Sequence, residues 1–149
     1  MKKLNYKILF KYLLVLLWMS AIFKFSADPA DVSDGKSGLV IQLLTSLGVD
    51  VNGILGNLTN FIVRKVAHFT EYFILSLLLI NALKENYNLN KTLKFAILIT
   101  FLYACSDEFH QLFVPGRSGR FKDVLIDTSG GLLVVLILKC IEKIKNRKE

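Results

Sequence analysis

The residues of this chain that could bind a ligand or catalyse a reaction lie in three separate polar stretches. In the first stretch, Arg64, His68 and Glu71 are spaced at i, i+4 and i+7, which places them on one face of a helix. The second stretch contains two adjacent acidic residues, and the third leads through two arginines to two aspartates one helical turn apart. Together the candidate site residues are Arg64, Lys65, His68, Glu71, Tyr72, Asp107, Glu108, His110, Gln111, Arg117, Arg120, Asp123 and Asp127.

Arginine is concentrated in these stretches, which hold three of the four arginines of the chain and both of its histidines. The guanidinium group is planar, permanently charged and suited to pairing with carboxylate or phosphate, whereas the lysine ammonium is a flexible point charge. This concentration indicates specific pairing. The partner is either acidic side chains of the same chain or an anionic ligand such as a lipid headgroup.

The first of these alternatives is a purely structural network. In it, three arginines would neutralise the acidic residues and simply hold helix ends together. The arginines are Arg64, Arg117 and Arg120, and the acidic residues are Glu71, Asp107, Glu108, Asp123 and Asp127.

Metal binding and acid–base catalysis are two further alternatives. The plausible metal ligands are His68, Glu71, Glu108, His110, Asp123 and Asp127. However, no HExxH or other dedicated metal-binding spacing is present, and the nearby arginines would compete for the carboxylates. We therefore expect no metal site and no cofactor. For acid–base catalysis, His110 with Glu108 is the candidate pair.

The composition indicates a membrane protein. Hydrophobic residues make up 53% of the chain, the mean hydropathy is +0.47, and yet 21% of residues are charged, so the two classes must be segregated along the sequence. The net charge of +7 comes mainly from lysines that flank long apolar blocks. Such lysines are typical of contacts with lipid headgroups, so the bilayer is the expected partner and nucleic acid is not.

The apolar blocks predict an all-α integral membrane bundle of about four transmembrane helices. A bilayer requires about 17–25 mostly apolar residues per helix, and the predicted helices cover residues 8–25, 64–83, 93–113 and 124–140. The first could also be a signal peptide, but no small-x-small cleavage motif follows, so we favour a retained helix. The polar end of the third must lie in a protein-lined cavity or at the interface.

Residues 26–63 form a long connection between the first two predicted helices. It opens with an acidic, turn-rich piece at 28–35 and continues with two short apolar segments, 39–47 and 54–63. Each segment is too short to span, so we expect interfacial or re-entrant helices. A fifth span built from this region is the alternative.

Lysine and arginine are more frequent on the side that would carry both termini, which predicts cytoplasmic termini in a bacterial cell membrane. The connection 26–63 is then extracytoplasmic, and residues 141–149 form a basic cytoplasmic tail. With this topology the three polar stretches meet at the extracytoplasmic end of the bundle. A small-residue patch at 127–131 predicts close helix packing beside them.

Two sequence blocks resemble those of the VanZ-like family. The blocks are Arg64-Lys65-x-x-His68-Phe69-x-Glu71-Tyr72, and Ser106-Asp107-Glu108-x-His110-Gln111-x-Phe113-Val114-Pro115-Gly116-Arg117-x-Gly119 followed by Asp123-Val124-x-x-Asp127-x-x-Gly130. The resemblance implies a small multi-pass bacterial membrane protein with a VanZ-like domain over about residues 8–140. Its founding member is associated with teicoplanin resistance. Two departures are Asp127, where the family often has Asn, and Val134, where a further glycine is common.

The residues and the resemblance together favour a non-enzymatic envelope protein. Its extracytoplasmic polar site would engage an anionic envelope lipid or cell-wall precursor and so affect glycopeptide susceptibility. The alternative is a membrane enzyme acting on a lipid-linked phosphate or ester. A transporter is a third class, although four helices without an inverted repeat disfavour it for a single subunit. No pattern in the sequence indicates an oligomeric state.

Overall fold

Helices account for all the regular structure of residues 5–147, which are the residues that the computed structural model describes. No strand occurs in this part of the chain, so the all-α prediction is confirmed. The elements are α1 (Tyr6–Ser26), α2 (Ala30–Ser46), α3 (Val51–Leu55), the 3-10 helix η1 (Gly56–Leu58), α4 (Thr59–Leu83), α5 (Leu89–Gln111) and α6 (Phe121–Lys145).

Three helical stretches within the described residues are long and apolar enough to cross a membrane. They are α1, the run Val51–Leu83 that ends in α4, and α6. Helix α5 is also long, but Lys91 and Lys94 near its start and Asp107 and Glu108 near its end leave a shorter apolar centre. The chain is thus a membrane protein with three clear spans, and α5 completes the predicted bundle of about four.

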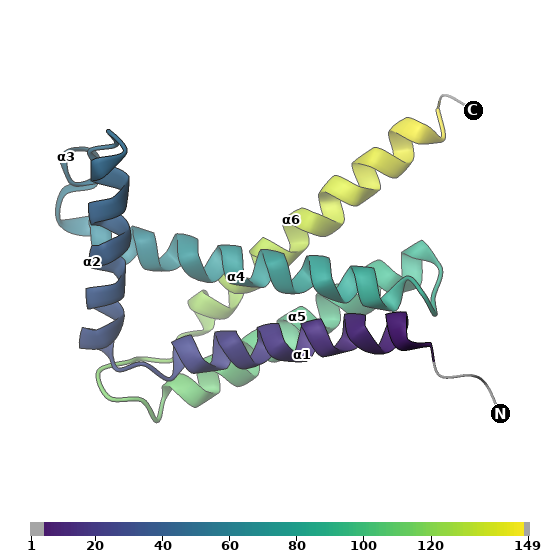
Figure 1. Cartoon of the computed structure of the whole chain (residues 1–149), viewed down its shortest axis with the longest axis horizontal. Helices are drawn as coiled ribbons and strands as arrows, with labels where there is room; N and C mark the ends of the chain where they lie inside the picture. Colours follow the sequence, from purple (N-terminus) through teal and green to yellow (C-terminus); the bar gives the residue numbers. More distant parts are fainter. Residues whose placement is uncertain (1–4, 148–149) are drawn as a thin grey trace.

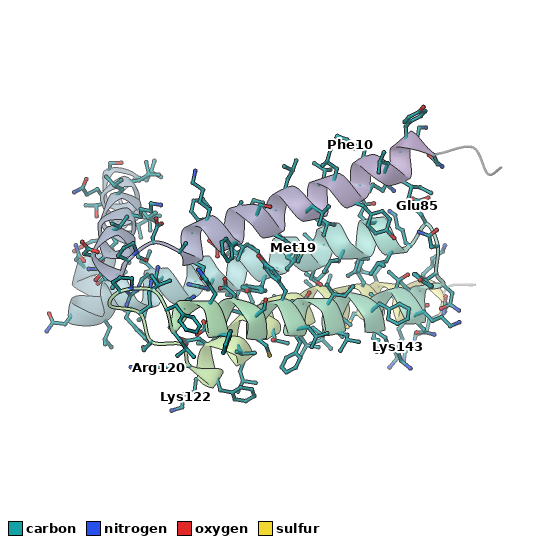
Figure 2. All side chains as sticks on the ribbon, turned by 90° about the horizontal axis from the view of Figure 1, so that it is seen from below. Phe10, Met19, Glu85, Arg120, Lys122 and Lys143 are labelled. Carbon is teal, nitrogen blue, oxygen red and sulfur yellow. The ribbon has the colours of Figure 1, made fainter. Side chains whose placement is uncertain are left out.

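The long helices alternate in direction, so three polar helix ends lie together. Figure 1 shows α1 and α5 running towards α2, whereas α4 and α6 run away from it. Both ends of the described chain lie at the opposite end of the molecule. In the second view, Arg120 and Lys122 lie at the α2 end, and Glu85 and Lys143 lie near the other (Figure 2). We call these the polar end and the terminal end.

The core lies between α4 and its neighbours. Tyr72 and Leu75 of α4 are fully buried, together with Ile22 of α1 and Leu93 of α5. By contrast, α1 turns large apolar side chains outwards, and Leu16 is 60% exposed. Outward apolar faces of this kind are stable against lipid tails rather than water.

Helices α4 and α6 cross closely at two glycines. A Cβ atom on Gly130 would overlap the carbonyl oxygen of Phe69, and one on Gly131 would press against Thr100 and Ser76. The Ser76 hydroxyl donates a hydrogen bond to the carbonyl of Gly131 (3.2 Å). The prediction that residues 127–131 serve close helix packing is confirmed. This crossing brings the preceding turn of α6 against the first half of α4.

Helix α2 differs from the predicted turn-rich piece followed by a short apolar segment. It begins at Ala30, directly after Pro29, and carries Asp31 in its first turn, where a carboxylate complements the helix dipole. It ends at Ser46 in a Schellman motif, in which the N–H of Gly48 (φ 89°) bonds to the Thr45 carbonyl and that of Val49 bonds to the Leu44 carbonyl. In Figure 1 it lies across the ends of α1 and α4, as an interfacial helix would.

The ends of the long helices also differ from the predicted limits. Helix α4 begins at Thr59 rather than 64. The predicted apolar segment 54–63 is divided, because its first half lies in α3 and η1 and its second half forms the first turn of α4. Helix α5 begins at Leu89, since the Asn88 side chain accepts a hydrogen bond from the Lys91 N–H and caps the helix.

Two further limits shift. Helix α5 ends at Gln111 instead of 113, and α6 extends to Lys145. The basic residues in the last turn of α6 favour this extension. Most of the predicted tail is therefore helical, and residues 148 and 149 lie outside the described part. Helix α2 carries Asp31, Asp34 and Lys36 in its first half and is not among the candidate spans, so the described structure gives a fifth crossing no support.

Candidate functional site

The loop from 112 to 120 is anchored to the turn that precedes α2. The Ala30 N–H donates a hydrogen bond to the Pro115 carbonyl (3.2 Å), and Arg117 Nε donates one to the Asp28 carbonyl (3.0 Å). Gly116 allows this approach, because its φ of 71° suits glycine and a Cβ there would meet the Ala30 side chain. These contacts hold Arg117 beside the first turn of α2.

A second anchor joins the end of α5 to the start of α6. The Arg120 backbone N–H donates a hydrogen bond to Glu108 Oε2 (2.9 Å), which places a carboxylate at the N-terminus of α6. Gly119 leaves room for this contact, since a Cβ there would overlap the Glu108 carbonyl. The sequence prediction that the polar end of this helix is enclosed by protein is confirmed, because Asp107, Glu108 and Gln111 are buried.

Two cavities open side by side at the polar end and share Arg64, His68 and Arg117. The first, of about 260 Å³, adds Lys36 to these and has an apolar wall that includes Phe25. The second, of about 240 Å³, is more polar. The first cavity is also lined by Val40, Val63, Ala67 and Glu71. The second is also lined by Lys65, Glu108, Gln111, Ser118, Arg120 and Asp123.

The ion pairs at this end differ from the predicted structural network. Arg64 pairs with Asp34 of α2 (2.8 Å), and Asp123 pairs with Lys65 (2.6 Å). Within residues 5–147, none of the three arginines lies within ion-pair distance of the five acidic residues predicted as their partners. For Arg64 the physical reason is that α2 folds over the cavity and brings the Asp34 carboxylate to this arginine.

Arg117 is the least neutralised of the shared cavity residues. The only hydrogen bond of its side chain to the described residues runs from Nε to a backbone carbonyl, and no described carboxylate pairs with it. Burial, with a further contribution from the nearby Arg64 charge, lowers the pKa of Arg117 below its usual value. Because arginine starts above pH 12, the group stays cationic at neutral pH. Its terminal N–H groups can therefore donate hydrogen bonds to an anionic partner.

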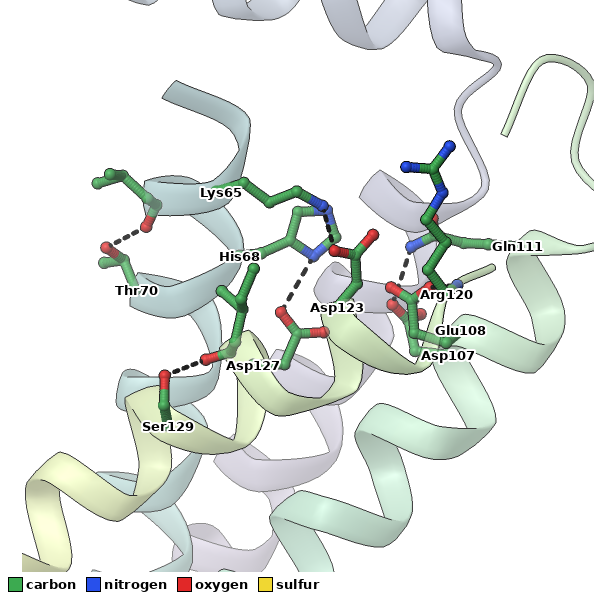
Figure 3. A network of polar contacts seen from close by, with 12 residues as sticks. Lys65, His68, Thr70, Asp107, Glu108, Gln111, Arg120, Asp123, Asp127 and Ser129 are labelled. Atoms are coloured by element: carbon green, nitrogen blue, oxygen red, sulfur yellow. Dashed lines mark hydrogen bonds and ion pairs between the residues drawn. The ribbon is translucent and has the colours of Figure 1, made fainter. Parts of the chain in front are cut away.

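Beneath the cavities, three helices bring two buried carboxyl groups close to a histidine. Asp127 of α6 and Asp107 of α5 are 1% and 2% exposed. Asp127 Oδ1 lies 3.6 Å from His68 Nδ1 of α4, as drawn in Figure 3. Asp107 accepts one hydrogen bond, from the Gln111 amide (3.3 Å). One ligand atom from each of Asp107, Asp127 and His68 lies within 4.8 Å of the others.

The sequence of this membrane bundle matches the VanZ/LLP1 family model over residues 10–142. The chain belongs to the VanZ/LLP1 family. The match spans all four long helices and every residue of both cavities, so the suspected resemblance is confirmed. Comparison with curated proteins and with solved structures gives no match.

Most of the predicted site residues of this VanZ/LLP1 protein gather at the cavities or directly beneath them, but His110 and Tyr72 do not line either one. The His110 ring packs against Phe23, with ring centroids 4.3 Å apart. Tyr72 is fully buried near Tyr103, whose ring centroid is 6.1 Å away. Acid–base catalysis by His110 with Glu108 therefore lacks a shared cavity.

Sequence reasoning missed the contribution of α2 and the turn before it. Asp28, Asp34 and Lys36 all lie at the polar end, where Lys36 pairs with Asp28 and lines the first cavity. The available signal was the cluster of charges directly after the first apolar helix. Asp107 was also absent from the predicted metal ligands, although it is one of the three groups that converge beneath the cavities.

Proposed function

We propose that this VanZ/LLP1 protein is a bacterial cell-membrane protein whose polar end binds the anionic headgroup of an envelope lipid or a lipid-linked cell-wall precursor. One observation carries the proposal: Arg64 and Arg117 line both cavities, and Arg117 has no carboxylate partner among the described residues. A guanidinium group without a carboxylate partner can recognise phosphate or carboxylate oxygens through paired hydrogen bonds.

The walls of the first cavity support a lipid rather than a free anion. Besides its basic residues it is lined by Phe25, Val40 and Val63, which suit the first carbons of an acyl or prenyl chain. The cavity lies between α2 and the helices that span the membrane. A headgroup bound there would remain at the level of the bilayer surface while its chain stayed in the hydrocarbon region.

Binding to lipid nanodiscs tests this proposal. The purified protein should bind phosphatidylglycerol better than phosphatidylcholine, and Arg117→Gln should weaken the anionic preference by about 10-fold, because a hydrogen bond to a charged group contributes about 1.5–3 kcal/mol. Lys143→Gln is the matched control, since it removes the same charge at the terminal end. Equal losses in the two variants would contradict a specific headgroup site.

We further propose that the polar end faces away from the cytoplasm and that both termini are cytoplasmic. Reporter fusions at Asn88 and at Gly116 should report opposite sides, with Asn88 inside. A swapped result would place the cavities in the cytoplasm and remove the link to cell-wall precursors.

The proposed role in glycopeptide susceptibility has a separate test. In a teicoplanin-sensitive host, expression of the protein should change teicoplanin susceptibility, and Arg117→Gln should abolish the change. Unaltered susceptibility in every case would leave lipid binding without a role in resistance.

A second candidate function is hydrolysis of a lipid-linked phosphate or ester. The observation that favours it is the pair of buried carboxyl groups, Asp107 and Asp127, next to His68 at the wall of both cavities. A general base and a charged pocket for the substrate are what such a reaction needs. Phosphate release from a polyprenyl phosphate, assayed with and without divalent metals, separates this function from binding alone.

A further inference from the structure

His68, Asp107 and Asp127 have the composition of a metal site. They come from α4, α5 and α6, so no local sequence motif announces them. Each offers one ligand atom, and these three atoms lie within 4.8 Å of one another (Figure 3). Two carboxylates and a neutral imidazole carry a charge of −2, which a divalent cation balances.

The hydrogen-bonding state of these atoms is the second observation. Both carboxylate oxygens of Asp127, Oδ1 of Asp107 and Nδ1 of His68 are buried and accept or donate no hydrogen bond among residues 5–147. A buried polar atom without a partner costs about 1–3 kcal/mol, and more when it is charged. Orphaned acceptors from three helices at one place indicate a missing ligand.

No lysine or arginine compensates these carboxylates within the described residues. Within the described residues, no lysine or arginine lies within 4.0 Å of Asp107 or Asp127, because Arg64 pairs with Asp34 and Lys65 pairs with Asp123. The sequence argument against a metal was that nearby arginines would compete for the carboxylates. That competition does not occur in the folded chain.

The distances fit a small transition-metal ion. Ligand atoms about 2.0–2.2 Å from zinc lie roughly 3.4 Å apart at the corners of a tetrahedron. His68 Nδ1 and Asp127 Oδ1 are 3.6 Å apart, close to that edge. The remaining separations are at most 4.8 Å, so metal binding would draw these side chains closer together. The imidazole nitrogen favours zinc, and the two carboxylates also suit manganese, whereas calcium and magnesium prefer sites made of oxygen ligands alone.

We propose that His68, Asp107 and Asp127 bind one divalent transition-metal ion, with zinc or manganese the best match. Three protein ligands leave at least one coordination position open. Because His68 also lines both cavities, the ion lies at their inner boundary. The open position is therefore available to water or to an anionic oxygen that enters a cavity.

Cobalt titration of the full chain in detergent, stripped with chelator and without an affinity tag, tests the site. We expect one Co²⁺ per chain, displaced by Zn²⁺, with no thiolate-to-cobalt band from Cys105 or Cys140. Asp127→Asn should lower the affinity by more than about 10-fold, a loss that removal of even an outer-shell partner causes. Asp107→Asn should have the same effect.

Asp31→Asn is the matched control, because it is the same change at an exposed carboxylate of α2 that lines neither cavity. It should bind Co²⁺ like the wild type. Zinc should raise the melting temperature of the wild type and of this control but not that of Asp127→Asn. Absence of stoichiometric binding to the wild type would overturn the proposal, as would equal losses in the Asp31 and Asp127 variants. Lipid binding is measured without metal, so either result can fail alone.

Discussion

At the terminal end of the bundle charged groups pair at the surface, whereas at the polar end two carboxyl groups are buried without a basic partner. Lys11 and Glu85 form an ion pair of 2.5 Å at the terminal end, and the Asn86 amide donates to the Tyr12 hydroxyl beside it. These groups keep contact with solvent. The polar end also has ion pairs at its surface, but it differs from the terminal end in the two carboxyl groups buried beneath them.

This difference separates a structural end from a functional one. Buried unpaired charge lowers stability, and a chain selected for stability alone would pair or remove it. In a membrane protein, ionisable groups below the surface usually mark the place where a ligand or ion binds. The four predictions that follow test the contrast, from the largest expected effect to the smallest.

Replacement of Gly130 should destabilise the chain most. Gly130→Val puts side-chain atoms where the Phe69 carbonyl lies, so α6 must move away from α4 and the groups beneath the cavities separate. We expect a loss of about 1–3 kcal/mol or more in SDS-induced unfolding from mixed micelles. Gly38→Ala is the control, because nothing lies within 4 Å of the added Cβ and alanine favours the helix. Similar losses at both positions would mean that the crossing does not depend on close contact.

Replacement of Asp127 should have the opposite sign. In the metal-free protein, Asp127→Asn removes a buried carboxyl group that has no lysine or arginine partner and keeps the side-chain shape, so we expect a gain on the order of 1–3 kcal/mol in the same unfolding assay. Ser129→Ala, at an exposed position on the same helix, controls for substitution alone. Destabilisation by Asp127→Asn without metal would show that the carboxylate is already compensated, and the contrast between the two ends would disappear.

The alternation of apolar blocks predicted the helices and their meeting point, because antiparallel crossings necessarily bring the end of one helix beside the start of the next. The position of Asp107 relative to Asp127 could not be predicted. These two groups and His68 come from three helices, and their convergence depends on the rotation of each helix about its axis. That rotation is fixed by tertiary contacts, such as those at Gly130 and Gly131, which no local spacing encodes.

Helix α2 shows a second limit of local reasoning. Aspartate and glycine in sequence favour turns, so the stretch at 28–35 indicated a loop. In the folded chain, Asp34 pairs with Arg64, and Ile41 and Ser37 are buried against the rest of the protein. These tertiary contacts outweigh weak helix propensities. The predicted acidic partners of Arg64 were therefore wrong, because its partner is Asp34 of α2.

Trp18 should contribute less than either residue discussed above. Its indole Nε1 donates a hydrogen bond to the carbonyl of Glu71 (2.9 Å), a residue that lines the first cavity. This bond joins α1 to α4 beside that cavity. Trp18→Phe keeps most of the packing and removes the donor, so we expect a loss of about 1 kcal/mol in the mixed-micelle assay. Tyr6→Phe, at an exposed aromatic residue of the same helix, should change nothing measurable. A larger loss than that of Gly130→Val would place the main support of the polar end in α1.

Glu85→Gln should have the smallest effect, because surface ion pairs contribute little. The hydrogen bond from Lys11 lowers the pKa of Glu85 below its usual value. The pair therefore stabilises the fold above the unfolded-state pKa, about 4.3, and this contribution is lost as the pH falls through the lower folded-state value. The wild type should be slightly more stable than Glu85→Gln at neutral pH, and the two unfolding midpoints should converge in acid. Salt should reduce the neutral-pH difference as well, since the pair is open to solvent. A difference that persists in acid or in high salt would mean that the terminal end, like the polar end, depends on a charge that solvent does not screen.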